Sequence, residues 1–257
     1  WVDPASQDPV EYLLRGDVAT VAVQYSYLNS PLALFTQGAY GVETAQAVFK
    51  RVYEHWRTLP RESRPRLYLH GLSLGSLNSD QSFDFFDIID DPFDGALWSG
   101  PPYRHETWRS VTAQREPGTP QWLPTFRAGA VVRFMNQGGL APGNTAERGA
   151  FRIVFLQYAS DPIVFFSPAS AWREPDWMKH PRGPDVSENL RWFPIITMLQ
   201  LGADTMVGTP APGFGHRYAA EDYIDAWLEL LGPLDWSSAD IPRLNARFAD
   251  RPHLPRT

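Results

Sequence analysis

The stretch Leu67–Gly75, with the sequence LYLHGLSLG, decides the fold. Its first four residues form a short apolar run that is typical of a buried strand, and the pattern G-x-S-x-G follows directly. Such a pattern places a serine on a sharp turn between a strand and a helix, where its hydroxyl is exposed at the end of a sheet. We expect Gly71 and Gly75 to be required, because a side chain at either position would collide with the neighbouring strand or helix. The stretch predicts that Ser73 is a nucleophile; an ordinary glycine-rich turn is the alternative.

Elements on both sides of this turn alternate between strand and helix. Strands are predicted at Val18–Leu28, Leu67–His70, Gly95–Trp98, Val131–Met135 and Phe151–Tyr158, and helices at Val42–Trp56, Ser187–Val207 and Ala219–Leu231. The strands are apolar throughout, which indicates a parallel sheet covered by helices on both faces. The pattern predicts an α/β fold in a single domain that covers residues 1–257.

The composition excludes several kinds of site. The chain has 257 residues and no cysteine, which rules out zinc fingers, iron–sulfur clusters, disulfides and thiol nucleophiles. Its net charge of −6 argues against a nucleic-acid partner, because phosphates bind to basic surfaces. No metal-binding or nucleotide-binding motif occurs, so we expect no cofactor and no metal. No run of about 18 apolar residues occurs either, so nothing in this chain is predicted to span a membrane.

A serine hydroxyl is a weak nucleophile and needs a base, together with an acid that orients the base. When the serine lies on a strand-to-helix turn of this kind, the acid follows it in the chain and the histidine comes last. Asp161 stands in the turn directly after the strand Phe151–Tyr158, at the carboxyl edge of the predicted sheet. His216 lies in a glycine-rich loop immediately before the last predicted helix. These positions predict a triad of Ser73, Asp161 and His216.

Other acids and histidines fit these roles less well. Glu106 follows the strand Gly95–Trp98 at the usable edge and is the second candidate for the acid. An acidic cluster precedes that strand, at the wrong edge, and is expected to be a solvated face; it consists of Asp84, Asp87, Asp90, Asp91 and Asp94. The remaining histidines lack a glycine-rich setting before the last helix, and His70 is expected to be packed in its strand. The others are His55, His105, His180 and His253.

Several longer blocks carry a resemblance to a known family. The segments LYLHGLSLGS, ASDPIVFFSP and GFGHRY resemble the α/β-hydrolase superfamily. More narrowly, the chain resembles the catalytic domain of a bacterial, largely actinobacterial, family of multi-pass membrane α/β-hydrolases. The blocks behind this narrower resemblance are WVDP at Trp1–Pro4, DVATVAVQYSYL at Asp17–Leu28, SGPP at Ser99–Pro102 and RGPDVSENLRWFP at Arg182–Pro194. The resemblance itself extends over nearly the whole chain.

The resemblance implies an esterase or lipase-like site on Ser73, Asp161 and His216, in a protein tethered to a membrane through a region that precedes this chain. Such enzymes stabilise the oxyanion with two backbone N–H groups, of which the residue after the nucleophile, Leu74, supplies one. In the resembled family the second comes from a loop before the residue that matches Trp1. We therefore expect this chain either to be weakly active alone or to associate with that N-terminal segment as a separate chain.

The connection between Asp161 and His216 is longer than the predicted fold requires and is rich in aromatic residues. Residues 162–212 are predicted to form a lid or cap over the site. The predicted substrate-binding residues, which would suit an apolar or lipid acyl group, are Phe165, Phe166, Trp172 and Trp192. Packing in the core is the alternative for each ring.

Three functions follow from these residues. Hydrolysis of carboxylic esters through an acyl-enzyme is the predicted one. The same triad would serve an acyltransferase if an alcohol replaced water in the second step. A non-catalytic lipid-binding domain is the third, and it is disfavoured because only chemistry requires a serine, an acid and a histidine in this order.

Overall fold

A five-stranded sheet forms the centre of the molecule in the computed structural model, which describes residues 2–24, 38–207, 211–237 and 239–249. The strands are β1 (Tyr68–Leu72), β2 (Gly95–Ser99), β3 (Val132–Asn136), β4 (Gly139–Leu140) and β5 (Arg152–Leu156). Their order is β1-β2-β5-β3-β4; all neighbouring pairs are parallel except β3 and β4, which form an antiparallel hairpin. Among the described residues, β1 is therefore an edge strand with no partner on its outer side.

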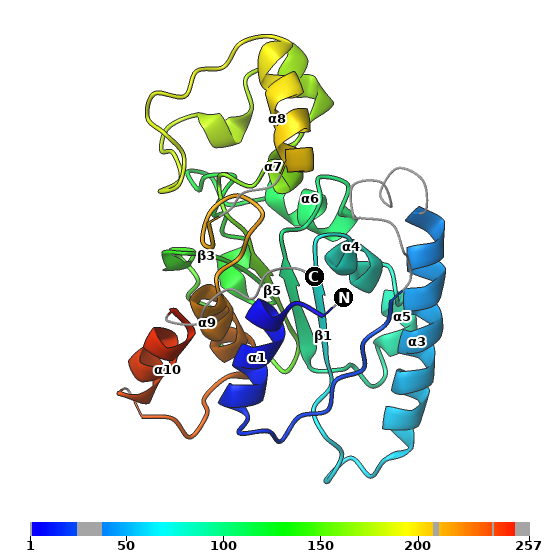
Figure 1. Ribbon diagram of the computed structural model, residues 1–257. Coiled ribbons are helices and arrows are strands. Elements are labelled where there is room, and N and C mark those ends of the chain that lie inside the picture. The colour runs from blue at the N-terminus through cyan, green and yellow to red at the C-terminus, as the bar shows by residue number, and fades with distance from the viewer. Residues whose placement is uncertain (1, 25–37, 208–210, 238, 250–257) are drawn as a thin grey trace.

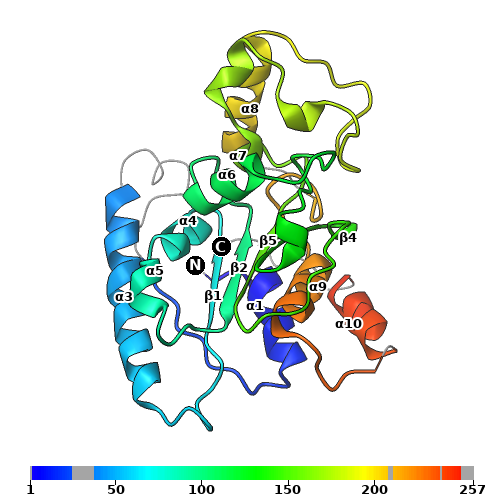
Figure 2. The same ribbon diagram turned by 180° about the vertical axis from the view of Figure 1, so that it is seen from behind.

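Helices cover both faces of this sheet (Figures 1 and 2). The α-helices are α1 (Pro4–Leu13), α3 (Gly38–Thr58), α4 (Leu74–Asp80), α5 (Phe85–Ile88), α6 (Glu106–Ala113), α7 (Pro162–Phe165), α8 (Ile196–Val207), α9 (Ala220–Leu231) and α10 (Asp240–Ala249). Three 3-10 turns, at Arg127–Gly129, Pro168–Ala171 and Asp176–Met178, complete the described elements. Figures 1 and 2 place α1, α9 and α10 on one side of the sheet and α3, α4 and α5 on the other.

The alternation of side chains along each strand divides the core into two layers. Trp98 and Phe155 point into a cluster that includes α6, whereas Leu97 and Val154 point into a cluster formed with α1, α9 and α10. Because successive residues of a strand face opposite sides, both sets of side chains are covered in a strand that has helices on both faces, and its residues are mostly apolar. This explains why the central strands β2 and β5 are buried at every residue.

The strand predictions are confirmed at four places and fail at one. The strands expected at Leu67–His70, Gly95–Trp98, Val131–Met135 and Phe151–Tyr158 are present within one or two residues at each end. At Val18–Leu28 the structure has no strand over residues 18–24, and residues 25–28 lie outside the described part. The side chains of this segment are unusually exposed for its composition: Val21 is 66% exposed. Its β-branched residues have no neighbouring strand to pair with among the described residues, and propensity alone does not make a strand.

The helix predictions hold for the longer helices but not at every boundary. The helix expected at Ser187–Val207 begins only at Ile196, because Pro194 and the backbone before it adopt an irregular path. Helix α1 was not predicted, although its start carries a recognisable signal. Asp3 accepts a hydrogen bond from the N–H of Ala5 and Pro4 occupies the first helical position, which is a common way to begin a helix.

The acidic cluster before β2 is only partly the solvated face that we expected. Asp91 is 8% exposed, and its carboxylate makes two hydrogen bonds to the guanidinium of Arg64, at 2.9 and 2.5 Å. Asp94 accepts a hydrogen bond from the N–H of Leu67 at 2.7 Å, next to the start of β1. These two carboxylates therefore stabilise the approach to β1 instead of facing solvent.

Residues 162–207, which run from α7 through α8 and form the projecting segment, extend beyond the carboxyl ends of the strands (Figure 1). Helix α8 packs against α7 and against the 3-10 turn Pro168–Ala171, so the projection has contacts of its own. Several large apolar side chains on it are exposed: Trp172, Phe193, Ile195, Ile196, Leu199 and Met206. Within the described ranges, no helix has both the length and the apolar character needed to cross a membrane.

Candidate active site

Ser73 lies on a strained turn between β1 and α4. Its backbone has φ 57° and ψ −123°, a region that residues other than glycine rarely adopt. A hydrogen bond from its N–H to the carbonyl of Ser99, at 2.9 Å, holds the turn against the end of β2. The side chain is 7% exposed. The local sequence thus folds into the sharp turn that the G-x-S-x-G pattern predicts.

The two glycines of the pattern are not equivalent. A Cβ atom on Gly71 would lie 2.3 Å from the backbone of Gly75, so only glycine fits the close approach of strand and helix. A Cβ atom on Gly75 would meet nothing within 4 Å. The expectation that both glycines are required is therefore wrong for Gly75.

Asp161 follows β5 and is buried at the start of α7, with 1% of its surface exposed. One carboxylate oxygen, Oδ1, accepts a hydrogen bond from the N–H of Ile163 at 2.9 Å. The other, Oδ2, lies 2.7 Å from His216 Nδ1 and also accepts from the hydroxyl of Tyr218 at 2.7 Å. An ionised carboxylate is an acceptor only, so His216 Nδ1 carries its proton and the other ring nitrogen, Nε2, is left free to act as a base.

Tyr218 is a member of this network that the sequence did not reveal. Its ring stacks on Tyr158, with centroids 4.3 Å apart, and it is 3% exposed. Burial, followed by the nearby charge of Asp161, raises the pKa of Tyr218 well above its usual value, so the hydroxyl stays protonated and donates to the carboxylate. No pattern in the sequence marks a tyrosine two residues after the histidine for this role.

His216 is positioned by a loop with two glycines in left-handed conformations, Gly213 and Gly215. Its ring packs directly on Gly100, because a Cβ atom there would lie 2.6 Å from His216 Cε1. Gly100 follows Ser99, whose carbonyl binds the N–H of Ser73. The structure therefore brings Asp161 and His216 into direct contact. Ser73 contacts Ser99 and His216 contacts the next residue, Gly100, so both lie at the end of β2.

Leu74 is the first residue of α4, and its backbone N–H has no partner among the described residues. The first N–H groups of a helix have no acceptor within the helix, and the helix dipole gives this end a partial positive charge. The N–H lies directly after the nucleophile, where it can donate to an oxygen on the attacked carbon. The oxyanion role of Leu74 stays a prediction.

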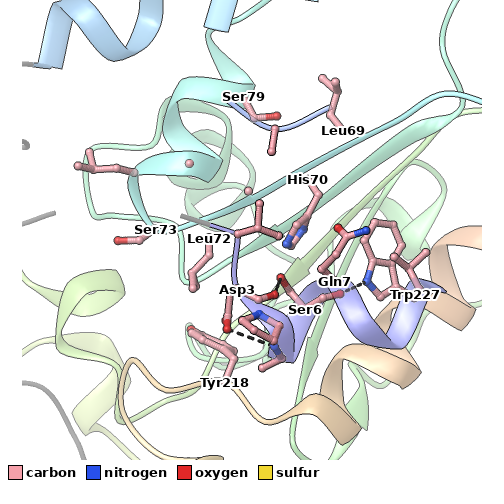
Figure 3. Close-up of a pocket in the computed structure, with 18 of the residues that line it drawn as sticks. Asp3, Ser6, Gln7, Leu69, His70, Leu72, Ser73, Ser79, Tyr218 and Trp227 are labelled. Atoms are coloured by element: carbon pink, nitrogen blue, oxygen red, sulfur yellow. Dashed lines mark hydrogen bonds between the residues drawn. The ribbon is translucent and has the colours of Figure 1, made fainter. Parts of the chain in front are cut away.

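A cavity of about 3370 Å³ reaches both Ser73 and His216. It runs along the open outer edge of β1, between α1 and residues 18–24 on one side and α3 on the other. Figure 3 shows His70 and Leu72 of β1 and the following Ser73 beside this space, with Ser6 and Gln7 of α1 and the preceding Asp3 opposite. Pockets for small ligands measure roughly 300–1,000 Å³, so this space is large enough for an extended chain.

The four aromatic residues predicted to bind substrate do not line this cavity. Phe165 is 3% exposed and packs in the core with Trp108 and Trp177, and Phe166 packs edge-on against Tyr103. Trp172 is 71% exposed, and Trp192 donates its ring N–H to the carbonyl of Ser170. Other apolar side chains from the projecting segment do line the cavity, among them Ile163, Trp177, Val186, Leu190, Leu201 and Met206. Sequence reasoning selected the largest rings, whereas packing decided which side chains face the cavity.

The competing acids and bases have other surroundings. Glu106 is exposed at the start of α6. Burial lowers the pKa of His70 to about 4, and its Nδ1 binds the carbonyl of Leu97, so it is a neutral packed residue as expected. Burial also lowers the pKa of His105 to about 3, and its Nδ1 accepts from the N–H of Trp108 at the start of α6. No group of three or more potential metal ligands occurs in the part of the chain that the structure describes.

Comparison with known proteins gives one match. The model of a family described as an alpha/beta-hydrolase family matches residues 1–244, nearly the whole chain. No curated protein and no solved structure matches the chain significantly.

Proposed function

The chain belongs to this alpha/beta-hydrolase family, and on that premise we propose that it is a serine hydrolase that cleaves carboxylic esters of apolar or lipid acyl groups. The observation that carries the proposal is the network at Asp161. This buried carboxylate holds His216 Nδ1 and the Tyr218 hydroxyl on one oxygen, and His216 lines the same cavity as Ser73. A buried carboxylate that orients an imidazole is the arrangement that activates a serine.

The reaction would proceed in two acyl transfers. Ser73 Oγ attacks the ester carbonyl carbon, and its proton passes to His216 Nε2 while the Leu74 N–H stabilises the oxyanion. The bond between the carbonyl carbon and the alcohol oxygen then breaks, and His216 returns the proton to the leaving alcohol. Water, deprotonated by His216, next attacks the acyl-enzyme, releases the acid and restores the Ser73 hydroxyl.

The preference for apolar acyl groups is supported by the cavity lining. Leu69, Leu72 and Val52 contribute to its walls along β1 and α3, and Ile163, Leu190 and Leu201 contribute from the projecting segment. Each methylene removed from water in such a space contributes about 0.8 kcal/mol to binding. We propose that residues 162–212 act as the lid of this site, and that the exposed apolar side chains on the segment keep the domain close to a membrane.

The second oxyanion donor is proposed to come from an extended segment that pairs with the outer edge of β1. Three features support this. The edge has no partner among the described residues, the cavity extends along it, and Ser73 follows its last residue. An unpaired strand edge is a template for a further strand. A segment parallel to β1 would end beside Ser73, and the sequence resemblance favours the N-terminal segment of the same protein as its source.

Labelling with a fluorophosphonate tests the nucleophile. We expect the wild-type chain to form one covalent adduct on Ser73, and the variant Ser73→Ala to form none and to lose hydrolysis of p-nitrophenyl esters by about 10⁴-fold or more. Ser110→Ala, an exposed serine on α6, is the matched control and should label like the wild type. An adduct elsewhere, or unchanged turnover in Ser73→Ala, would refute the proposal.

The same assay, run with acyl chains of increasing length and with added alcohols, examines the finer claims. A rise in kcat/KM with chain length is expected from the apolar cavity. Formation of the transesterified product in preference to the free acid would instead favour an acyltransferase. Adding a peptide with the sequence of the N-terminal segment should raise the rate by about 10²–10³-fold if it supplies the second donor. An unchanged rate with peptide bound would contradict that part of the proposal.

A further inference from the structure

The block RGPDVSENL at Arg182–Leu190 lies in the projecting segment and has no role in the chemistry described above. One side chain in it, Asp185, contacts the turn that carries the catalytic acid. Its Oδ2 accepts two hydrogen bonds from Ser160, one from the backbone N–H at 2.9 Å and one from the hydroxyl at 2.5 Å. Ser160 immediately precedes Asp161. The Asp185 carboxylate therefore joins the projecting segment to the turn that carries Asp161.

Ser160 also contacts the histidine loop. Its Oγ, which donates to Asp185, accepts a hydrogen bond from the backbone N–H of Gly215 at 2.8 Å. Gly215 is the residue before His216 and has φ 59°, a left-handed conformation that glycine adopts readily, and the contact with Ser160 anchors the loop at this point. The chain of hydrogen bonds runs from Asp185 through Ser160 to the loop that carries the base. A hydroxyl that donates to a carboxylate is polarised, which strengthens the bond that it accepts.

Two other residues of the block, Arg182 and Gly183, hold Asp185 close to Ser160. The guanidinium of Arg182 donates to four backbone carbonyls around the loop, those of Met178, Ser187, Glu188 and Leu190, at 2.7 to 3.0 Å. Gly183 lies so close to the acid turn that a Cβ atom there would be 2.1 Å from Ala159 Cβ. Arg182 therefore closes the loop, and Gly183 lets it approach the turn, so that Asp185 reaches Ser160.

We propose that Asp185 is a positioning residue of the active site. Through Ser160 it holds the turn that carries Asp161 and the loop that carries His216 in a fixed relative position. The projecting segment therefore contributes to the catalytic geometry as well as acting as a lid. This inference rests on the proposed function. Two properties of the carboxylate favour a positioning role. Its Oδ2 accepts two hydrogen bonds from Ser160, and its Oδ1 is buried with no hydrogen-bond partner among the described residues, an arrangement that costs free energy.

Kinetics of three variants test the role in catalysis. We expect Asp185→Ala to lower kcat by about 10- to 100-fold with KM changed less than about twofold, because a displacement of about 1 Å at the base has an effect of this size. Asp185→Asn keeps one oxygen that can accept from Ser160 and should recover much of the rate. Asp176→Ala, a carboxylate of the same segment that pairs with Lys179 and Arg115, is the control and should retain the wild-type kcat.

A double substitution distinguishes the loss of the hydrogen bonds from Asp185 through Ser160 to Gly215 from a general loss of structure. Ser160→Ala removes only the hydroxyl that links Asp185 to Gly215, and should lower kcat by about the same factor as Asp185→Ala. If both act on one path, the double variant will be no slower than the slower single variant, whereas independent effects would multiply. A multiplied loss, or an Asp185→Ala variant with wild-type kcat, would overturn the inference.

The Nδ1 proton of His216 provides a readout that does not depend on turnover. In histidine labelled with ¹⁵N, the hydrogen bond to Asp161 should give a low-field proton signal in the wild type. This signal should broaden or vanish in Asp185→Ala and remain in Asp176→Ala. An unchanged signal in Asp185→Ala would overturn the inference whatever the enzyme does. A wild type that keeps the signal but fails to react at Ser73 would refute the proposed function instead.

Discussion

Gly71 and Gly75 flank the nucleophile, and the space around each glycine differs. Gly71 faces the backbone of α4 at 2.3 Å from where its Cβ would lie, so a methyl group there must push strand and helix apart. We expect Gly71→Ala to reduce the free energy of unfolding by about 3 kcal/mol and to abolish labelling of Ser73. Urea unfolding followed by fluorescence, together with the fluorophosphonate assay, measures both effects.

Gly75→Ala is the matched comparison. Its Cβ would meet nothing within 4 Å, and alanine has a higher helix propensity than glycine, so this variant should be as stable as the wild type or more stable by up to about 1 kcal/mol. Equal destabilisation of the two variants would show that the turn is not held by the close contact at Gly71.

Among the helices, α6 begins at a buried histidine, His105. His105 is fully buried, its Nδ1 accepts from the N–H of Trp108, and burial lowers its pKa to about 3. The unfolded chain binds a proton at this residue below about pH 6.5, whereas the folded chain stays neutral down to about pH 3. The free energy of unfolding must therefore fall as the pH is lowered through this interval.

The substitution His105→Asn isolates that effect, because asparagine can also accept the N-terminal hydrogen bond of a helix but does not titrate. Between pH 7 and pH 5 we expect the wild type to lose about 2 kcal/mol more than His105→Asn. Urea titrations at several pH values give the comparison. Parallel pH profiles for the two proteins would mean that His105 is protonated in the folded state.

Helix α9 carries a buried ion pair at the opposite end of the sheet from the active site. Glu229 Oε1 accepts from Arg133 at 2.8 Å and from Arg152, a side chain with 2% of its surface exposed. Removal of the carboxylate would leave two arginine charges buried without a counter-ion. We expect Glu229→Gln to cost about 3–5 kcal/mol of unfolding free energy, and Glu221→Gln, on the first turn of the same helix, to cost less than about 1 kcal/mol.

At the scale of the whole molecule, we expect the exposed apolar side chains of the projecting segment to affect which substrates reach the site. Ile196 is 55% and Leu199 is 60% exposed on α8, and large exposed apolar groups mark contacts with partners or membranes. We expect the double variant with Ile196→Thr and Leu199→Gln to hydrolyse long-chain esters in vesicles about tenfold more slowly, because each buried side chain contributes about 1.5–3 kcal/mol at most.

The rate on a water-soluble short-chain ester should not change in this double variant, since the triad is untouched. A matched loss on both substrates would indicate damage to the lid or the site, and no loss on vesicles would show that these side chains do not meet the lipid surface.

The amino-acid sequence by itself determined the α/β architecture. Strands that are buried on both faces are mostly apolar along their length, and in this chain such stretches alternate with helical ones. It also identified the residues that meet at the carboxyl edge of the sheet, where parallel strands end together: Asp161 and His216 lie within hydrogen-bond distance, and Ser73 lies on the expected turn. These features depend on local sequence patterns and on the order of the residues along the chain, and both can be read directly from the sequence.

Only the tertiary structure decided the contacts between distant segments. It brings Tyr218 into hydrogen-bond contact with Asp161, and Asp185 into contact with Ser160. It also keeps the four predicted aromatic side chains out of the cavity lining and leaves the outer edge of β1 without a partner among the described residues. All of these features depend on how separate segments pack. The segment Val18–Leu28 gives the reason most directly. Its composition is that of a strand, but a strand exists only where another strand offers its backbone groups, and no neighbour does so for residues 18–24 among the described residues.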